Sequence, residues 1–331
     1  MTDPAGPRRL GEFGRIARYM RPLSEGFAGA RGLRDDAAIL DPPKGCSLVV
    51  TTDTIVAGVH FVGDEGPGDV AAKALRVNLS DLAGMGAQPF CYALNLALPQ
   101  SLEDAWLEAF CAELAAEQAR FGLHLVGGDS VSTPGPVTVT LTAFGVVPAG
   151  RALHRDGGEA GDDVWVSGTI GDGLLGLEAV RAHAHGPQAA YLIARYRRPE
   201  PRLALGARLV GVARAALDVS DGLIADLAHL AEESGLAAEI AAPSVPLSEA
   251  AAEHLAGHPE RFADLLTAGD DYELVFAAPP AARADIEAVA LETATPVARI
   301  GRLLAGAPGA VRALDKAGAV LPIDRTGYRH D

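Results

Sequence analysis

The sequence has 331 residues, more than a single hydrophobic core usually serves, so its length predicts two domains. Hydrophobic residues make up 49% of the chain and charged residues 21%, which is typical of a globular protein and excludes a disordered or fibrous one. The formal net charge of −15 disfavours nucleic acid as a partner, because an anionic surface repels a phosphate backbone.

The cysteines and the apolar runs indicate in which cellular compartment the protein is expected. Cys46, Cys91 and Cys111 form no C-x-x-C pair and no metal-ligand spacing, so we expect free thiols in a reducing environment. No apolar run is long enough to cross a bilayer, and residues 1–10 lead into no apolar signal segment. These features predict a cytoplasmic protein with no membrane partner.

The first half of the chain mixes helical and strand patterns. Helical spacing predicts a helix over residues 11–23, with Phe13, Ile16, Ala17 and Met20 on one face. Apolar and threonine residues alternate over 137–147, which predicts a strand with one buried face. Further strands are expected at 47–55 and 90–98, and further helices at 69–86 and 102–121.

The second half follows a Gly-rich, charged segment at 148–161, which we interpret as the boundary between domains 1–148 and 149–331. Strands are expected at 163–167, 215–219 and 274–277, and a helix at 174–183. Leu223, Leu227 and Leu230 form one apolar stripe on another helix. The patterns together indicate an α+β N-terminal half and an α/β-like C-terminal half.

Aspartates recur at the predicted strand ends and helix starts. Each alone is typical of a cap or a turn. Strand ends and helix starts tend to converge on one rim, where several carboxylates would repel one another unless divalent cations bridge them. Carboxylates and hydroxyls without a Cys or His cluster favour Mg²⁺ over zinc. The aspartates are Asp35, Asp36, Asp53, Asp81, Asp129, Asp218, Asp221, Asp270 and Asp271.

Glycines accompany these acids. Gly127 and Gly128 precede Asp129 and would let backbone N–H groups approach an anion. Residues 220–222 open a helix, whose N-terminal end favours a phosphate. The pattern therefore predicts a metal-bridged polyphosphate as ligand and phosphoryl transfer as chemistry.

In its ordered motifs the chain resembles the thiamine-monophosphate kinase family over nearly its whole length. The resemblance implies the two-domain α+β fold of aminoimidazole-ribonucleotide synthetase, with an N-terminal α/β domain (1–148) that binds metal and ATP and pairs its sheet across a homodimer. The C-terminal domain (149–331) would be an α/β sandwich. The motifs are Asp35-Asp36, Thr51-Thr52-Asp53, Gly58-Val59-His60, Asn78-Leu79-Ser80-Asp81, Gly127-Gly128-Asp129, Asp218-Val219-Ser220-Asp221-Gly222 and Gly269-Asp270-Asp271-Tyr272.

The resemblance implies Mg²⁺-dependent, direct transfer of the ATP γ-phosphate to thiamine monophosphate, with no separate catalytic base. It also implies roles for single residues. Magnesium ligands, direct or through water, would be Asp35, Thr52, Asp53, Asp81, Asp129, Asp218 and Asp221. Nucleotide contacts would be Thr51, Gly128, Arg155 and Ser220, and substrate contacts would be His60, Asp270 and Tyr328.

The chain departs from the family pattern at three positions. Arg34, Asp270 and Asp331 stand where the family usually has glycine, glutamate and phenylalanine. We expect these changes to bear on substrate affinity more than on the metal site. Arg34 adds a Cβ to the turn before Asp35.

Several alternatives remain open. Another ATP-using member of the superfamily, such as aminoimidazole-ribonucleotide synthetase, selenophosphate synthetase or a hydrogenase-maturation protein, would differ in its acceptor. A non-catalytic nucleotide-binding module would lack the substrate contacts. Residues 171–176 match the G-x-G-x-x-G of NAD-dependent dehydrogenases, but the acid expected about 20 residues later is missing, so we expect a packing turn. We interpret Lys73 as a solvated helix lysine.

Overall fold

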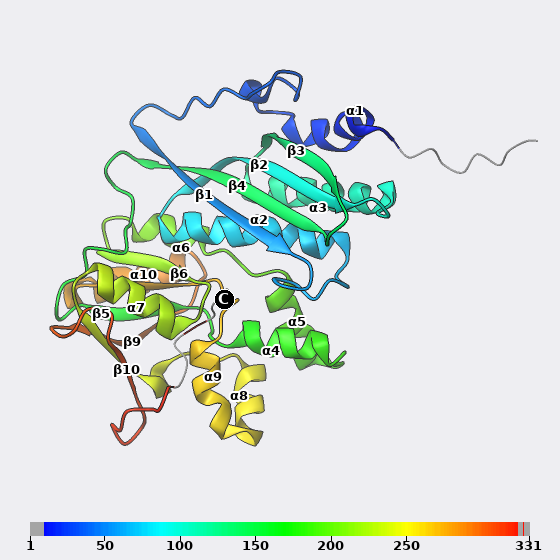
Figure 1. Cartoon of the computed structure of the whole chain (residues 1–331). Coiled ribbons are helices and arrows are strands. Elements are labelled where there is room, and N and C mark those ends of the chain that lie inside the picture. Colours follow the sequence, from blue (N-terminus) through cyan, green and yellow to red (C-terminus); the bar gives the residue numbers. More distant parts are fainter. Residues whose placement is uncertain (1–9, 324–326, 328–331) are drawn as a thin grey trace, which may run out of the picture. The chain divides into compact units, whose positions relative to one another are not determined.

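The computed structural model describes residues 10–323 and Gly327, and these fall into two compact units (Figure 1). The N-terminal unit comprises Val50–Asn78, Pro89–Val146 and the described part of Met1–Lys44. The C-terminal unit comprises Gly45–Val49, Leu79–Gln88 and the described part of Val147–Asp331. Two short segments of the first half of the chain therefore belong to the C-terminal unit.

A four-stranded sheet in the order β1-β4-β2-β3 forms the centre of the N-terminal unit (Figure 1). Thr52 faces Thr142 and Thr54 faces Thr140, so β1 and β4 run antiparallel, while β2 and β3 are parallel. On β4, alternate residues are buried, which confirms the predicted strand with one buried face. The elements of this half are β1 (Cys46–Val56), α2 (Pro67–Gly84), β2 (Gln88–Pro99), α3 (Asp104–Phe121), β3 (Leu125–Thr133) and β4 (Thr138–Pro148).

The N-terminal segment differs from the single helix expected over residues 11–23. It consists of α1 (Glu12–Arg15), a π turn (Ile16–Met20) and a 3₁₀ turn (Arg21–Ser24). Pro22, the second residue of the 3₁₀ turn, has no N–H to donate, which breaks the helical ladder. The predicted apolar face is wrong at Phe13, whose side chain is 82% exposed.

Helix α2 is buried nearly all round, because every residue from 70 to 80 is buried. Its first part, through Asn78, belongs to the N-terminal unit and its last part to the C-terminal unit. Lys73 is only 2% exposed, so its interpretation as a solvated lysine is wrong. The predicted helix over 69–86 is confirmed, with bounds shifted by two residues.

The C-terminal unit contains a six-stranded sheet in the order β10-β7-β9-β5-β8-β6. The β10–β7 pair is parallel, whereas β5, β6 and β7 pair antiparallel with their other neighbours. Its strands are β5 (Asp163–Ser167), β6 (Ala215–Val219), β7 (Ala237–Ala241), β8 (Glu273–Ala278), β9 (Val297–Leu304) and β10 (Val311–Leu314). Its helices are α4 (Asp172–Arg181), α5 (Pro187–Arg197), α6 (Leu203–Leu209), α7 (Leu223–Glu233), α8 (Glu249–Gly257), α9 (Phe262–Thr267) and α10 (Arg283–Glu292).

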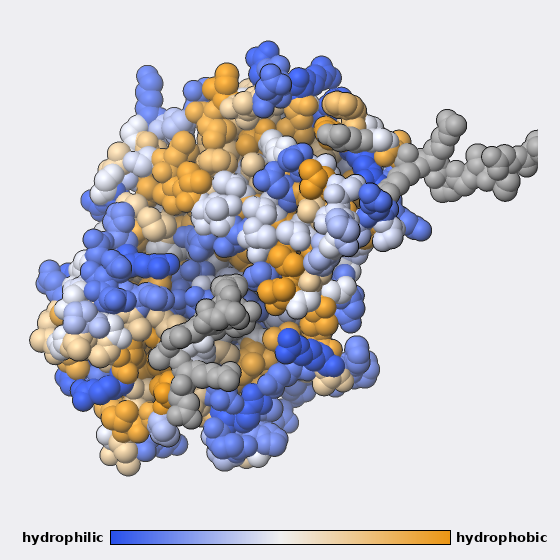
Figure 2. All heavy atoms as spheres, in the orientation of Figure 1, coloured by the Kyte–Doolittle hydropathy of each residue, from blue (hydrophilic) through white to orange (hydrophobic). Residues whose placement is uncertain are grey.

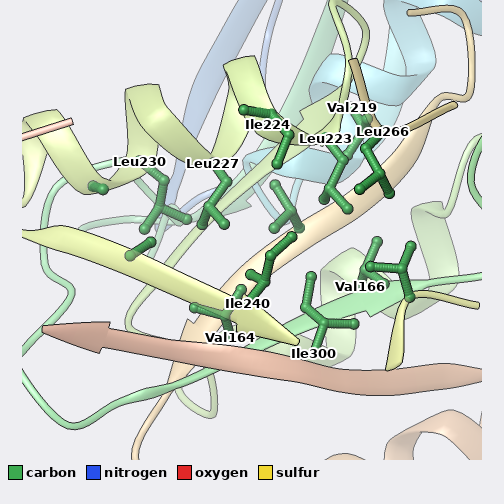
Figure 3. Close-up of a cluster of buried hydrophobic side chains, with 14 of the residues drawn as sticks. Val164, Val166, Val219, Leu223, Ile224, Leu227, Leu230, Ile240, Leu266 and Ile300 are labelled. Atoms are coloured by element: carbon green, nitrogen blue, oxygen red, sulfur yellow. The ribbon is translucent and has the colours of Figure 1, made fainter. Parts of the chain in front are cut away.

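Apolar side chains cover both faces of the six-stranded sheet. On one face, Leu223, Leu227 and Leu230 of α7 point onto Val164 and Ile240 of the strands (Figure 3). On the other face, residues of α6 and α10 pack with Trp165 and Phe276 of the strands. The predicted stripe on α7 is confirmed, and each fully buried leucine contributes about 1.5–3 kcal/mol. Between residues 10 and 323, no helix is both long and apolar enough to span a membrane.

Candidate active site

Strand β1 carries three of the predicted site residues, Thr51, Thr52 and Asp53. The backbone N–H of Asp53 donates to Oδ1 of Asn78 at 3.1 Å, and the Nδ2 of this fully buried asparagine donates to the backbone of α2. The Thr52 hydroxyl lies 3.0 Å from the Thr142 hydroxyl on β4. Asp53 is therefore fixed by the helix on one side, and Thr52 by the neighbouring strand.

The turn before Asp35 is built by left-handed residues. Arg31, Gly32 and Leu33 have φ values of 50°, 65° and 54°. Arg34 does not have a positive φ, so its Cβ does not strain the backbone of this turn. Asp35 is exposed and forms an ion pair with Arg31, four residues earlier in the chain.

His60 follows β1 and is half-buried. Its Nδ1 accepts the backbone N–H of Val56 at 3.1 Å. Since this nitrogen is an acceptor, the proton of the neutral imidazole lies on Nε2. The backbone of the preceding turn thus fixes the orientation of the ring.

Gly128 lies within β3, directly opposite Leu94 of β2. Its φ is 147°, and a Cβ at this position would lie 1.8 Å from the Leu94 carbonyl oxygen. The sequence did not predict a strand here, because two glycines interrupt the apolar pattern. The next residue, Asp129, is exposed, and its Oδ1 accepts the N–H of Ser130 at 2.7 Å.

The C-terminal unit brings the end of α2 onto the end of β6. The hydroxyl of Ser80 donates to Oδ2 of Asp218 at 2.7 Å, and both side chains are buried. A Cβ on Gly84 would lie 3.1 Å from the Asp218 backbone nitrogen, so the helix approaches the strand closely. Asp81, the neighbour of Ser80, is thereby carried on the segment that contacts Asp218.

The turn at residues 220–222 differs from the predicted phosphate cradle. The backbone N–H groups of Ser220, Asp221 and Gly222 all donate to Oδ2 of Asp226, at 3.0, 3.0 and 3.1 Å. Burial, followed by the charge of Asp221, raises the pKa of Asp226 to about 7. The amides of this turn therefore bind a carboxylate of α7, and the side chains of Ser220 and Asp221 remain as ligand groups.

Asp270 lies directly beside that turn. Its backbone N–H donates to the Ser220 carbonyl at 2.9 Å, and that of Tyr272 donates to the Val219 carbonyl at 2.8 Å. The Tyr272 hydroxyl donates to Oδ1 of Asp270 at 3.1 Å. Because β6 and β8 are antiparallel, the end of one and the start of the other lie together, which brings Asp218, Ser220, Asp221 and Asp270 to one edge.

The two remaining predicted residues lie apart from this edge or outside the described chain. Arg155 is exposed on the segment before β5, and its carbonyl accepts the Ser234 hydroxyl at 3.1 Å. Tyr328 lies outside the described residues. A Cβ on its neighbour Gly327 would lie 2.5 Å from the Ala225 Cβ and 3.0 Å from the Asp221 carbonyl oxygen.

Two families of known domains match the chain in succession. Residues 34–147 match the family described as AIR synthase related protein, N-terminal domain, and residues 159–313 match the corresponding C-terminal domain. The thiamine-monophosphate kinase of Salmonella typhimurium is 41% identical over 97% of this chain and 98% of its own. The chain belongs to the thiamine-monophosphate kinase family. The enzyme of that name from Escherichia coli has the same identity, over 97% of this chain and 98% of its own.

Solved structures agree with this membership of the thiamine-monophosphate kinase family. The thiamine-monophosphate kinase from Stenotrophomonas maltophilia is 42% identical, with a TM-score of 0.78 over 84% of this chain and 89% of its own. A structure of AaThiL complexed with AMPPCP and TMP is 30% identical, with a TM-score of 0.77 over 99% of this chain and 100% of its own. The predicted two-domain α+β fold is confirmed.

Residues 171–176 do not bind a dinucleotide in the manner of a dehydrogenase. The N–H groups of Gly171 and Gly173 donate to the carboxylate of Asp271, at 2.8 and 3.0 Å. A Cβ on Gly176 would lie 2.2 Å from the Leu192 carbonyl oxygen. The motif is therefore a packing turn, as expected, and not a pyrophosphate site.

Three residues of this region were not singled out as site residues from the sequence. Ser80 and Asp226 hold the predicted ligands Asp218 and Asp221, and Asp271 holds the turn at Gly171. The only sequence signal was their place within or just after the aspartate motifs. Within residues 10–323 and Gly327, no group of three or more His, Cys, Asp or Glu side chains that could hold a metal ion is found.

Proposed function

We propose that the chain transfers the γ-phosphate of ATP to thiamine monophosphate, giving thiamine diphosphate and ADP. The observation that carries this proposal is the 41% identity to thiamine-monophosphate kinases over nearly the full length of both chains. In this reaction an oxygen of the acceptor phosphate forms a bond to the γ-phosphorus as the bond to ADP breaks. The acceptor is already an anion at neutral pH, so the chain needs positioning and charge neutralisation more than a base.

We propose magnesium as the metal, held by Asp35, Thr52, Asp53, Asp81, Asp129, Asp218 and Asp221. These residues offer only carboxylate and hydroxyl oxygens, which is the donor set that Mg²⁺ prefers. Bound magnesium would neutralise charge on the phosphates of ATP. The Ser80 hydroxyl and the Asn78 amide support the proposal, because they orient Asp218 and the backbone of Asp53.

For the nucleotide we propose contacts from Thr51, Gly128, Arg155 and Ser220. Arg155 is exposed, so its guanidinium is accessible to a phosphate. Because Gly128 has no side chain, residue 128 does not cover the backbone of β3 next to Asp129.

For the substrate we propose contacts from His60, Asp270 and Tyr328. The thiazolium ring of thiamine is a cation, and Asp270 offers an anionic partner. His60 presents Nε2–H as a donor, because its Nδ1 accepts the Val56 amide. Gly327 lies against Asp221, which supports a role for the adjoining Tyr328.

We further propose a cytoplasmic homodimer that pairs through the four-stranded sheet of the N-terminal domain, residues 1–148, with 149–331 as the C-terminal domain. Strands β1 and β3 are the edges of that sheet, and Val50 and Val131 on them are 57% and 50% exposed. Apolar residues also gather on the visible surface over this sheet (Figure 2). Exposed apolar edge strands are typical of interfaces.

An acceptor assay tests the proposed activity. The purified chain with ATP and Mg²⁺ is offered thiamine, thiamine monophosphate or an aminoimidazole precursor, and product formation is followed by chromatography. We expect thiamine diphosphate from thiamine monophosphate alone. Turnover of the aminoimidazole precursor instead would favour another member of the superfamily.

Removal of the metal tests the second part of the proposal. Excess chelator is expected to abolish turnover, and added Mg²⁺ is expected to restore it, because the carboxylates otherwise repel the phosphates of ATP. Asp53→Ala is expected to lower turnover at least about a hundredfold in a folded protein. Full turnover in chelator would exclude the metal from the reaction.

A further inference from the structure

A buried polar network adjoins the proposed substrate contact Asp270. Three of its carboxylates, those of Asp172, Asp271 and Glu273, are no more than 1% exposed. Arg195 and Arg202 form ion pairs with Glu273 in this network. The three carboxylates are shielded from solvent, whereas the side chains of Arg195 and Arg202 are 13% and 17% exposed.

Asp271 is held through both its side chain and its backbone. Its two carboxylate oxygens accept the N–H groups of Gly171 and Gly173 at the start of α4, at 2.8 and 3.0 Å. Its carbonyl accepts an N–H of Arg195 at 3.2 Å. Burial raises the pKa of Asp271 to about 8, and the two amides and Arg195 act in the opposite direction.

Glu273 anchors the chain two residues later. It accepts the Ser167 hydroxyl at 2.6 Å, and it forms ion pairs with Arg195 at 2.8 Å and with Arg202 at 2.5 Å. The segment between these anchors is therefore fixed at both ends by the interior of the C-terminal unit. Tyr272 is the single residue between them.

The backbone beside these anchors has an unusual conformation. Asp270 and Tyr272 both have left-handed φ values, 71° and 52°. Residues with a Cβ rarely adopt this conformation unless their surroundings impose it. The surroundings are close here, because a Cβ on Gly173 would lie 2.6 Å from the Asp270 carbonyl, and the Asp270 N–H donates to Ser220.

From this geometry we infer that Asp271 is a positioning residue that fixes Asp270 for recognition of the cationic substrate. The inference rests on the proposed function, since it takes Asp270 to contact thiamine monophosphate. Asp271 itself does not touch the substrate. Its carboxylate holds the start of α4 against the Asp270 backbone, and this contact sets the direction in which the Asp270 carboxylate points.

The test compares steady-state kinetics of four variants with the wild type. Asp271→Asn replaces one acceptor oxygen by an NH₂ group that opposes a backbone N–H. We expect the KM for thiamine monophosphate to rise about tenfold, the effect of losing one hydrogen bond to a charged group. The KM for ATP and kcat are expected to change less than about twofold, because only substrate binding depends on this contact. Asp270→Asn is expected to show the same pattern.

Gly173→Ala disturbs the same contact from the side of α4, and it decides the question if Asp271→Asn does not fold. It is expected to raise the KM for thiamine monophosphate as well. Asp163→Asn is the matched control, since Asp163 is a buried carboxylate of β5 paired with Arg283 and Arg299. It is expected to leave all kinetic constants unchanged.

The outcomes separate the inference from the proposed function. A wild-type chain that does not phosphorylate thiamine monophosphate overturns both. An unchanged substrate KM in Asp270→Asn overturns the inference, because Asp271 would then have no contact to position. A raised KM in Asp270→Asn, with no rise in either folded Asp271→Asn or Gly173→Ala, overturns the inference and leaves the proposed function standing.

Discussion

Gly128 illustrates how a single residue can be required by packing and still lie in the proposed nucleotide site. Its φ of 147° is rarely open to a residue with a Cβ, and that Cβ would overlap the Leu94 carbonyl oxygen at 1.8 Å. We expect Gly128→Ala to lower the free energy of unfolding by about 3 kcal/mol or more, because β2 and β3 would have to separate locally. Urea unfolding followed by circular dichroism measures the change.

The adjacent glycine supplies the control for that experiment. Gly127 has no positive φ, and a Cβ there would meet nothing within 4 Å. Gly127→Ala is therefore expected to leave stability unchanged or to raise it by about 0.5 kcal/mol. Equal losses in both variants would contradict the steric explanation.

The sequence motifs did not indicate which atoms hold the predicted site residues. The chain motifs indicated that Asp218, Ser220 and Asp221 belong together, and the structure carries them to one edge of the C-terminal unit. The same motifs suggested that the amides of residues 220–222 face a phosphate. They donate to Asp226 instead, whose carboxylate lies one turn into α7 and accepts all three N–H groups.

At the scale of elements, ion pairs of one buried aspartate connect β5 to α10 and β9. Asp163 is buried on β5, and its carboxylate accepts hydrogen bonds from Arg283 at 2.6 and 2.9 Å and from Arg299 at 3.2 Å. The hydrogen bonds from Arg283, followed by those from Arg299 and despite the opposing effect of burial, hold the pKa of Asp163 below its usual range.

This lowered pKa predicts a pH dependence of stability. The folded state holds the ionised carboxylate more tightly than the unfolded state, so the stabilisation is complete above the unfolded pKa of about 4. It is lost as the pH falls through the lower folded pKa. We expect Asp163→Asn to reduce the free energy of unfolding by about 2 kcal/mol at pH 7, with a difference that shrinks below pH ~4. Urea titrations between pH 3 and 7 measure it.

The control for this prediction is Asp285→Asn, since Asp285 is exposed on α10. It is expected to change the free energy of unfolding by less than about 0.5 kcal/mol at every pH. A pH-independent difference in Asp163→Asn would contradict the role assigned to the ion pairs.

The elements predicted from sequence share a strong local pattern. Strands β5 and β6 agree with the expected bounds, because each is a short apolar run buried on both faces. Strand β3 was not predicted, since its glycines remove the pattern while its partner β2 supplies the pairing. The N-terminal segment was predicted as one helix, and Pro22 converts its end into a 3₁₀ turn. Local signals therefore predict elements well only where tertiary contacts do not override them.

At the scale of the whole molecule, the edge strand β1 predicts an assembly. Val50 is 57% exposed on that edge, and an edge strand is a typical place for pairing with a second chain. We expect the wild type to sediment as a dimer and Val50→Lys to sediment as a monomer at the same concentration, because a buried lysine would oppose pairing. Analytical ultracentrifugation distinguishes the two.

Leu291→Lys is the matched control for the assembly. Leu291 is 84% exposed on α10, outside the four-stranded sheet, so its replacement is expected to leave the dimer intact. A wild-type chain that is monomeric at all concentrations would contradict the proposed pairing. Loss of the dimer in the Leu291 variant alone would place the interface elsewhere.

Helix α2 has a consequence for how the protein melts. The N-terminal unit uses its first part and the C-terminal unit its last part, and residues 70–80 are buried without a break. A helix shared in this way cannot unravel in one unit without withdrawing support from the other. A fragment cut in the family boundary between residues 147 and 159 would therefore separate residues 79–84 of α2 from the rest of the unit to which they belong.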